Sequence, residues 1–134
     1  MYQLAPSESR IHKKALVVDD NAVCRTMHAL ALTSLGYVVT TACDGLAGVT
    51  AVQLGTFDII TMDVRMPVMN GFECTRQIRL MENSGISRAT IIGVSSSDAE
   101  QECFKAGMDA FTKKPLNRNF LRAILGHVAA PSRP

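Results

Sequence analysis

Five polar side chains stand where short apolar or β-branched runs of this 134-residue chain end. Two adjacent acids, Asp19 and Asp20, close one run, and a third acid, Asp63, closes another. Ser95 and Lys114 close two later runs. If these runs are parallel strands, their carboxyl ends share one edge of a sheet, where sites of open α/β sheets lie. The pattern therefore predicts a site made of three carboxylates, a hydroxyl group and an ammonium group.

Three carboxylates at one sheet edge imply a bound cation. Without one they would repel each other and raise one another's pKa values. Ligand sets made only of oxygen favour a hard ion such as Mg²⁺, which typically binds one or two carboxylates, a phosphate oxygen and several waters. We therefore expect a magnesium site in which Asp19 and Asp20 hold the ion directly or through water.

The same residues are suited to phosphoryl transfer, in which a protein mainly positions a nucleophile and neutralises negative charge. Asp63 would be the nucleophile and would form an aspartyl phosphate. Lys114 supplies positive charge for the phosphoryl oxygens, and the Ser95 hydroxyl can donate a hydrogen bond to them. The backbone N–H groups of Val64 and Ser96 can donate in the same way.

Strand-like and helical segments alternate along the chain, as such a site requires. Apolar or β-branched runs predict strands at residues 14–20, 37–42, 57–63, 90–95 and 110–114. Helical spacing of apolar residues predicts helices at residues 22–35, 46–54, 72–81, 98–106 and 117–128. This order implies an α/β fold with a parallel sheet, helices on both faces and right-handed crossovers.

Four motifs follow one another in the order typical of a known family. They are VVDDN at 17–21, MDVRMPVMNG at 62–71, the hydroxyl residue Ser95 and KKP at 113–115. Together they make residues 14–128 resemble the response-regulator receiver domains of two-component phosphorelays. The resemblance implies a flavodoxin-like three-layer sandwich of five βα units with strand order 2-1-3-4-5. It also implies Mg²⁺-dependent phosphorylation of Asp63 by a phosphohistidine of a histidine kinase or a histidine phosphotransfer protein.

The resemblance also implies individual metal ligands. Asp20, Asp63 and the backbone carbonyl of Arg65 would bind Mg²⁺, and Asp19 would act through water. Because the Arg65 side chain can reach over the acceptor, we expect it to influence how fast the phosphoryl group is lost.

Ser95 and Phe111 match a pair of family positions that shift toward the site on phosphorylation and alter the face made by the fourth helix and the fifth strand. Phe111 lacks a hydroxyl group, so its inward position cannot be held by a hydrogen bond. A switch in this chain would therefore depend on packing and on the Ser95 contact.

Several of these residues also have plainer interpretations. An acidic pair after a strand is often only a helix cap, and Ser97 is a candidate cap for the helix expected near residue 98. Phe111 suits a core as well as a switch, and Lys113 should face solvent because side chains alternate along a strand. We interpret the Pro- and Gly-containing loop at 64–71 as a scaffold for the acceptor.

Composition limits the class of protein. The formal net charge of +2 is far from the basic excess of a nucleic-acid binder, and no apolar run is long enough to span a membrane. We expect a cytoplasmic monomer, present in the nucleus as well if its pathway requires it. The cysteines form no C-x-x-C pair, so we expect reduced thiols packed in the core rather than zinc or disulfides: Cys24, Cys43, Cys74 and Cys103. The histidines have no mutual spacing that suggests a phosphoryl donor: His12, His28 and His127.

We expect a stand-alone receiver with a flexible lead-in at 1–13, the domain at 14–128 and a flexible tail at 129–134. Its motifs are similar to those of short plant response regulators (type-C-like) of the cytokinin phosphorelay and of hybrid histidine kinase receivers. Such a domain would signal by docking or would drain phosphate from a phosphotransfer protein, and we favour draining. It would not be an enzyme in the ordinary sense, because it promotes its own phosphorylation and hydrolysis and turns over no free substrate.

Two other functions fit parts of the pattern. A pseudo-receiver would be recognised by partners without any phosphate, but the complete set of five site residues argues against it. A haloacid-dehalogenase-like phosphatase also forms an aspartyl phosphate. Such enzymes need a second catalytic acid two residues beyond the nucleophile, where this chain has Arg65.

Overall fold

Ten helices and strands alternate along the part of the chain that the structure, a computed structural model, describes, which is residues 13–129. The strands are β1 (Lys13–Val18), β2 (Tyr37–Ala42), β3 (Ile59–Asp63), β4 (Thr90–Ser95) and β5 (Ala110–Lys113). The helices are α2 (Ala22–Ser34), α3 (Gly45–Leu54), α4 (Gly71–Asn83), α5 (Glu100–Ala106) and α6 (Arg118–Ala129).

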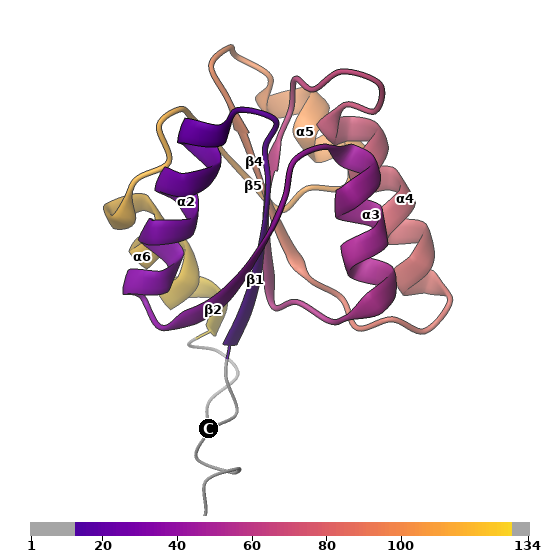
Figure 1. Ribbon diagram of the computed structural model, residues 1–134, viewed down its shortest axis with the longest axis horizontal. Coiled ribbons are helices and arrows are strands. Elements are labelled where there is room, and N and C mark those ends of the chain that lie inside the picture. The colour runs from indigo at the N-terminus through magenta and orange to yellow at the C-terminus, as the bar shows by residue number, and fades with distance from the viewer. Residues whose placement is uncertain (1–12, 130–134) are drawn as a thin grey trace, which may run out of the picture.

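The five strands form one parallel sheet between two layers of helices. Their order is β2-β1-β3-β4-β5, so β1, β3 and β4 are central and β2 and β5 are the edges. Helices α2 and α6 lie on one face of the sheet, and α3, α4 and α5 lie on the other (Figure 1). The flavodoxin-like sandwich and the strand order predicted from the sequence are confirmed.

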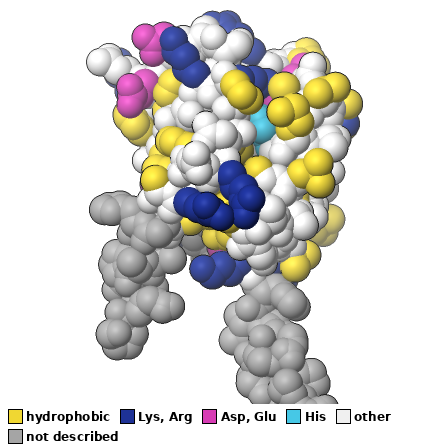
Figure 2. All heavy atoms as spheres, turned by 90° about the vertical axis from the view of Figure 1, so that its left-hand side faces the viewer, with side chains coloured by type: hydrophobic (Ala, Val, Ile, Leu, Met, Phe, Trp, Pro, Cys, Tyr) yellow, Lys and Arg dark blue, Asp and Glu magenta, His cyan; other side chains and the backbone are white. Residues whose placement is uncertain are grey.

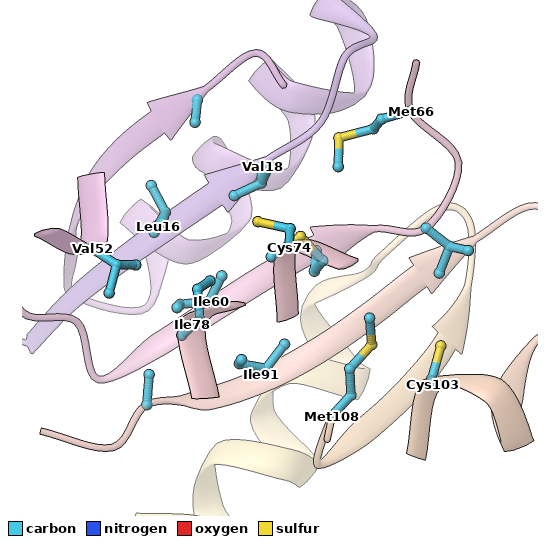
Figure 3. Close-up of a cluster of buried hydrophobic side chains, with 14 of the residues drawn as sticks. Leu16, Val18, Val52, Ile60, Met66, Cys74, Ile78, Ile91, Cys103 and Met108 are labelled. Atoms are coloured by element: carbon cyan, nitrogen blue, oxygen red, sulfur yellow. The ribbon is translucent and has the colours of Figure 1, made fainter. Parts of the chain in front are cut away.

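Two apolar clusters, one on each face, hold the layers together. Leu16, Ile60 and Ile91 of the three central strands pack with Ile78 of α4 on one face (Figure 3). Neighbouring residues along each strand point the other way and pack beneath α2 and α6. All five residues of β3 are buried, which is typical of a central parallel strand. The last of them is Asp63, so the core fixes the position of the predicted acceptor.

Side-chain caps fix where four of the helices begin. The residues Asn21, Asp44, Asn70 and Asn117 each accept a hydrogen bond at 2.8–2.9 Å from the backbone N–H three residues later. Asn21 directly follows the acidic pair, and Asn70 closes the loop after Asp63. Two of these caps therefore also hold the loops that carry the site.

The observed bounds differ slightly from the predicted ones at the strand ends. β1 ends at Val18 and β5 at Lys113, so Asp19, Asp20 and Lys114 lie in the loops beyond rather than within the strands. The backbone pairing nevertheless continues past both ends. The Asp19 N–H donates to the Ala42 carbonyl at 3.1 Å, and the Lys114 N–H donates to the Ser95 carbonyl at 2.9 Å. These bonds hold the polar residues at the edge of the sheet.

The cysteine prediction is correct for two thiols and wrong for one. Cys74 and Cys103 are buried, Cys24 is half-buried and Cys43 is exposed; all four are free. Cys43 is exposed because it lies directly beyond β2, an edge strand with no neighbour on its outer side.

The predicted flexible segments, apart from Lys13 and Ala129, lie outside the described residues, and so does His12. Within residues 13–129, no helix has the length and apolar character that crossing a bilayer demands.

Candidate functional site

The three acids lie together at the carboxyl edge of the sheet. Asp19 and Asp20 follow β1, Asp63 ends β3, and these two strands are neighbours. One carboxylate oxygen from each residue lies within 4.8 Å of the others. Asp19 and Asp63 are 1% and 4% exposed, whereas Asp20 is on the surface. The cluster is therefore buried below and open to solvent at Asp20.

Lys114 contacts two of these carboxylates. Its Nζ lies 3.2 Å from Asp19 Oδ2 and 3.4 Å from Asp63 Oδ1. Burial works against the ammonium ion, but the carboxylates of Asp63 and Asp19 raise the pKa of Lys114 overall. Lys114 therefore stays charged beside the acceptor. Lys113 next to it is exposed, as side-chain alternation predicts.

The surroundings of Asp63 raise the pKa of its carboxyl group. Burial is the main cause and the Asp19 carboxylate the next; against the opposing charge of Lys114 they raise the pKa of Asp63 to about 7. The surroundings of Asp63 therefore disfavour the ionised form, which is the form that a carboxylate nucleophile needs. A further positive charge at the cluster would restore its ionisation.

The residues fit a magnesium ion. Asp19 Oδ1 accepts a hydrogen bond from the Asn21 N–H at 2.9 Å, but Asp19 Oδ2 is buried without any hydrogen-bond partner among the described groups. Lys114 Nζ, 3.2 Å from this oxygen, supplies one positive charge for three carboxylates, so the cluster still favours a further cation. The donor set contains only oxygen, the preference of Mg²⁺.

Ser95 is buried at the end of β4 and belongs to a short chain of polar contacts. Its Oγ accepts a hydrogen bond from the Ser97 N–H at 3.1 Å and lies 3.2 Å from Ser97 Oγ. Arg65 Nε and Nη2 donate to the same Ser97 Oγ at 3.2 and 3.1 Å. Arg65, two residues beyond Asp63, is therefore linked through Ser97 to the hydroxyl at the site.

Ser97 does not cap a helix, contrary to the sequence interpretation. α5 begins two residues later than predicted, at Glu100, and its N-cap residue Ala99 makes no side-chain hydrogen bond. The reason is that the Ser97 hydroxyl is engaged with Ser95 and Arg65. This tertiary contact outweighs the local preference of serine for a helix start.

The other predicted site residues lie nearby in less direct positions. The Val64 N–H donates to the Val94 carbonyl at 3.1 Å, so it must give up that bond before it can donate to a phosphoryl group. Ser96 directly follows β4 and is exposed. Phe111 is half-buried, pairs in register with Gly93 and packs against the core cluster on the α4 side.

His28 is a site neighbour that the sequence analysis did not identify. It is 2% exposed on the inner side of α2, and its Nδ1 lies 3.9 Å from Asp19 Oδ2. Burial is the main influence and lowers the pKa of His28, against the effect of Asp19. The signal in the sequence was helical spacing, because His28 and Leu32, four residues apart, are the two buried residues of α2.

Comparisons with known proteins agree with this geometry. A profile described as the response regulator receiver domain matches residues 15–126. The histidine kinase CKI1 of Arabidopsis thaliana is 38% identical over an alignment covering 84% of this chain and 12% of the kinase. The chain spans about a tenth of the length of the curated relatives that it matches.

Two solved receiver structures are similar throughout the domain. One is the CKI1 receiver domain of Arabidopsis thaliana complexed with Mg²⁺, at 37% identity and a TM-score of 0.75, covering 84% of this chain and 91% of that one. The other is the receiver domain of the sensor histidine kinase PA1611 of Pseudomonas aeruginosa, with a magnesium ion in its active-site cleft. It is 36% identical with a TM-score of 0.76, covering 87% of this chain and 96% of that one. The match across residues 15–126, the strand order and the acidic edge with its lysine establish that the chain belongs to the response-regulator receiver domain family.

Proposed function

We propose that this domain accepts a phosphoryl group on Asp63 from a phosphohistidine, in a reaction supported by Mg²⁺. One observation carries the proposal, namely that oxygens of Asp19, Asp20 and Asp63 lie within 4.8 Å of one another, with Lys114 Nζ 3.4 Å from the acceptor. A nucleophile, a cation site and a fixed positive charge are the parts that phosphoryl transfer needs.

Asp20, Asp63 and the backbone carbonyl of Arg65 are the proposed direct ligands of the ion, and Asp19 the ligand through water. The binding of Mg²⁺ to the CKI1 and PA1611 receivers supports this assignment. When bound, Mg²⁺ neutralises negative charge on the phosphoryl oxygens. A cation among the carboxylates would also free Lys114 from Asp19 to meet those oxygens.

The proposed reaction is a transfer between two side chains. A carboxylate oxygen of Asp63 attacks phosphorus, and the new O–P bond forms as the N–P bond of the phosphohistidine breaks. The donor nitrogen keeps the electron pair of that bond, and the released imidazole gains its missing proton from solvent if it left unprotonated. Hydrolysis then replaces the aspartyl O–P bond with a bond to water oxygen, releasing inorganic phosphate and regenerating the Asp63 carboxylate.

Ser95 Oγ and the N–H groups of Val64 and Ser96 are the proposed hydrogen-bond donors to the phosphoryl group. Ser95 can reach this role only by changing its contact with Ser97 Oγ, which at present lies 3.2 Å away. Movement of Ser95 would open room on β4 beside β5, where Phe111 is half-buried. We therefore keep Ser95 and Phe111 as the proposed switch pair, driven by packing.

The proposed donor is a histidine phosphotransfer protein or a histidine kinase, and the kinase relatives support this choice. We propose that the domain works in the cytoplasm and in the nucleus, where it would meet such a donor. The receiver unit is proposed to span 14–128, in keeping with the family match.

An apolar stripe beside the site is the proposed docking surface for that donor. Val23, Met27 and Leu30, at helical spacing on α2, are 67%, 48% and 64% exposed. The face formed by α2 and α6 is turned to the viewer in Figure 2, where hydrophobic side chains gather on part of it. α2 begins one residue beyond the acidic pair, after its cap Asn21, so a protein bound along the stripe would have its histidine within reach of Asp63.

Phosphoryl uptake tests the proposed function. Labelled phosphate from a phosphorylated histidine phosphotransfer protein should appear in the wild type with Mg²⁺ and should be absent after chelation or in Asp63→Asn. Asp58→Asn, an exposed acid away from the cluster, is the matched control and should accept phosphate normally. Equal labelling of wild type and Asp63→Asn would overturn the proposal, and no labelling from several donors would favour the pseudo-receiver.

We further propose that the phosphoryl group on Asp63 is removed by hydrolysis, so that the domain drains phosphate from its donor. A cavity of about 410 Å³ lies beside the acceptor loop, with Arg65, Met66 and Phe72 on one side and Asp98 and Glu102 on the other. Because Arg65 lines it, truncation of this side chain should admit water more readily. We expect Arg65→Ala to shorten the lifetime of the aspartyl phosphate several-fold, with Arg76→Ala on α4 as the control. An unchanged or longer lifetime of labelled protein would contradict this role of Arg65.

A further inference from the structure

A buried imidazole lies behind the catalytic cluster, and the proposed reaction does not use it. His28 Nδ1 is 3.9 Å from Asp19 Oδ2, and both side chains are almost fully buried. Lys114 Nζ is 3.2 Å from the same oxygen. Asp19 Oδ2 thus has two nitrogen groups near it, yet it makes no hydrogen bond with any described group.

The proposed phosphoryl transfer requires Lys114 to move away from Asp19. Lys114 bridges Asp19 and Asp63 in the metal-free protein, and it must turn to the phosphoryl oxygens to stabilise their charge. Asp19 Oδ2 then loses its nearest cation on that side. A buried carboxylate oxygen without a partner is costly, so something on its inner side has to compensate.

We propose that His28 is a positioning residue that orients the Asp19 carboxylate from the interior through an Nδ1–H donor when bound Mg²⁺ frees Lys114 from Asp19. The inference rests on the proposed function, because it assigns His28 a role toward the Mg²⁺ site. Its contact is with Asp19, whose other oxygen is already fixed by the Asn21 N–H at 2.9 Å. Holding both oxygens would keep Asp19 aligned toward the ion and its water, as outer partners of metal ligands commonly do.

The alternative is that His28 only fills space under α2. Two variants separate the roles, because Leu replaces the volume without a donor, whereas the Asn side-chain NH₂ lies near the position of Nδ1. We expect His28→Leu to weaken Mg²⁺ binding roughly tenfold, and His28→Asn to restore most of the affinity. Mg²⁺ alone is the probe, titrated by calorimetry at neutral pH without phosphodonor, and the unfolding free energy of each variant is measured in parallel.

A second measurement reports on the imidazole itself. Long-range ¹H–¹⁵N spectra of the wild type should show a proton on Nδ1 and a shift of that nitrogen on Mg²⁺ addition, and Asp19→Asn should remove the shift. The proposal would be contradicted by an Nδ1 that carries no proton, or by one whose chemical shift does not change when Mg²⁺ is added.

The outcomes distinguish this inference from the function on which it rests. If the wild type binds Mg²⁺ and takes up phosphate, but His28→Leu binds the ion equally well, only the role of His28 is overturned. The same holds if Asn and Leu weaken binding equally, since packing would then be the cause. Failure of the wild type itself to bind Mg²⁺ would overturn the metal site and the proposed function together.

Discussion

In its proposed role as the nucleophile, Asp63 has to be ionised to attack phosphorus, yet its surroundings raise its pKa and so favour the protonated form. Burial and Asp19 raise its pKa to about 7, and only Lys114 acts in the opposite direction. A cation bound at the cluster would lower this pKa and so increase the fraction of Asp63 that is ionised. The raised pKa also makes the stability of the domain depend on pH.

The effect on stability has a definite sign. A carboxyl group whose pKa is raised by folding, from about 3.9 in the unfolded chain to about 7 here, stabilises the fold below its unfolded pKa. This contribution is lost as pH rises through the folded value. We therefore expect the metal-free wild type to lose roughly 1–2 kcal/mol of stability between pH 6 and pH 8 that Asp63→Asn retains.

Denaturant unfolding without divalent ions at both pH values measures this difference. With saturating Mg²⁺ the wild type should regain stability, while Asp63→Asn should gain less from the ion. The same pH dependence in wild type and Asp63→Asn would show that Asp63 is not the group responsible.

At the scale of elements, the first residue of α4 determines how closely this helix approaches Asp63. A Cβ atom on Gly71 would collide with the backbone carbonyl oxygen of Asp63, and the Gly71 N–H donates to the Val64 carbonyl at 2.9 Å. The loop can therefore close back on the end of β3 only because residue 71 lacks a side chain. The Asn70 cap then starts the helix at that point.

We expect Gly71→Ala to destabilise the domain by about 2 kcal/mol or more and to reduce phosphoryl uptake by Asp63. Gly55→Ala is a matched control, because a Cβ there meets only the Ala51 carbonyl at an ordinary 3.9 Å. Thermal unfolding and labelling of the two variants provide the comparison. If Gly71→Ala behaved like Gly55→Ala, close packing of α4 on the acceptor would not matter.

The exposed stripe on α2 should matter only to a protein donor. We expect Leu30→Glu to raise the KM for a phosphorylated histidine phosphotransfer protein about tenfold, as loss of a well-buried interface side chain does. Uptake from a small donor such as acetyl phosphate should not change. Leu80→Glu on α4 is the control, since Leu80 is as exposed as Leu30. Equal effects of the two substitutions would place the docking surface elsewhere.

The sequence was sufficient for elements whose signal is local. Apolar or β-branched runs identified every strand, and the convergence of Asp19, Asp63 and Lys114 followed from parallel strand ends meeting at one edge. Roles that depend on tertiary contacts could not be predicted from the sequence. Ser97 looked like a helix cap until Arg65 and Ser95 were seen to engage it, and His28 looked unremarkable until α2 was placed over Asp19.

At the scale of the whole molecule, one end of the sheet carries the acidic cluster and the other end is held by hydrogen bonds from Arg79. The carboxyl edge carries the acids and keeps Asp19 Oδ2 unsatisfied. The opposite edge is tied by Arg79 of α4, which donates to Glu82, to Asp109 and to the carbonyls of Ala89 and Gly107 at 2.7–2.9 Å. These contacts join α4 to the starts of β4 and β5, so the end of the sheet opposite the site is firmly held.

Substitution of Arg79 should lower the stability of the fold without changing the proposed Mg²⁺ site. We expect Arg79→Met to lower the unfolding free energy by about 2–4 kcal/mol, because it leaves half-buried carboxylates and carbonyls unpaired. Mg²⁺ affinity at 25 °C should not change. Arg76→Met, which removes only an exposed pair with Glu73, should cost much less. A clear loss of Mg²⁺ affinity in Arg79→Met would show that the two ends of the sheet are coupled.

The most direct test of the central claim is to locate the phosphoryl group. The wild type is incubated with Mg²⁺ and a phosphorylated histidine phosphotransfer protein, then treated with borohydride, which reduces an aspartyl phosphate to homoserine, and digested for mass spectrometry. Our account predicts homoserine at position 63 and at no other aspartate, and none when Mg²⁺ is chelated. Modification at Asp19 or Asp20 with Asp63 unchanged, or phosphate found on a serine or histidine instead, would contradict it.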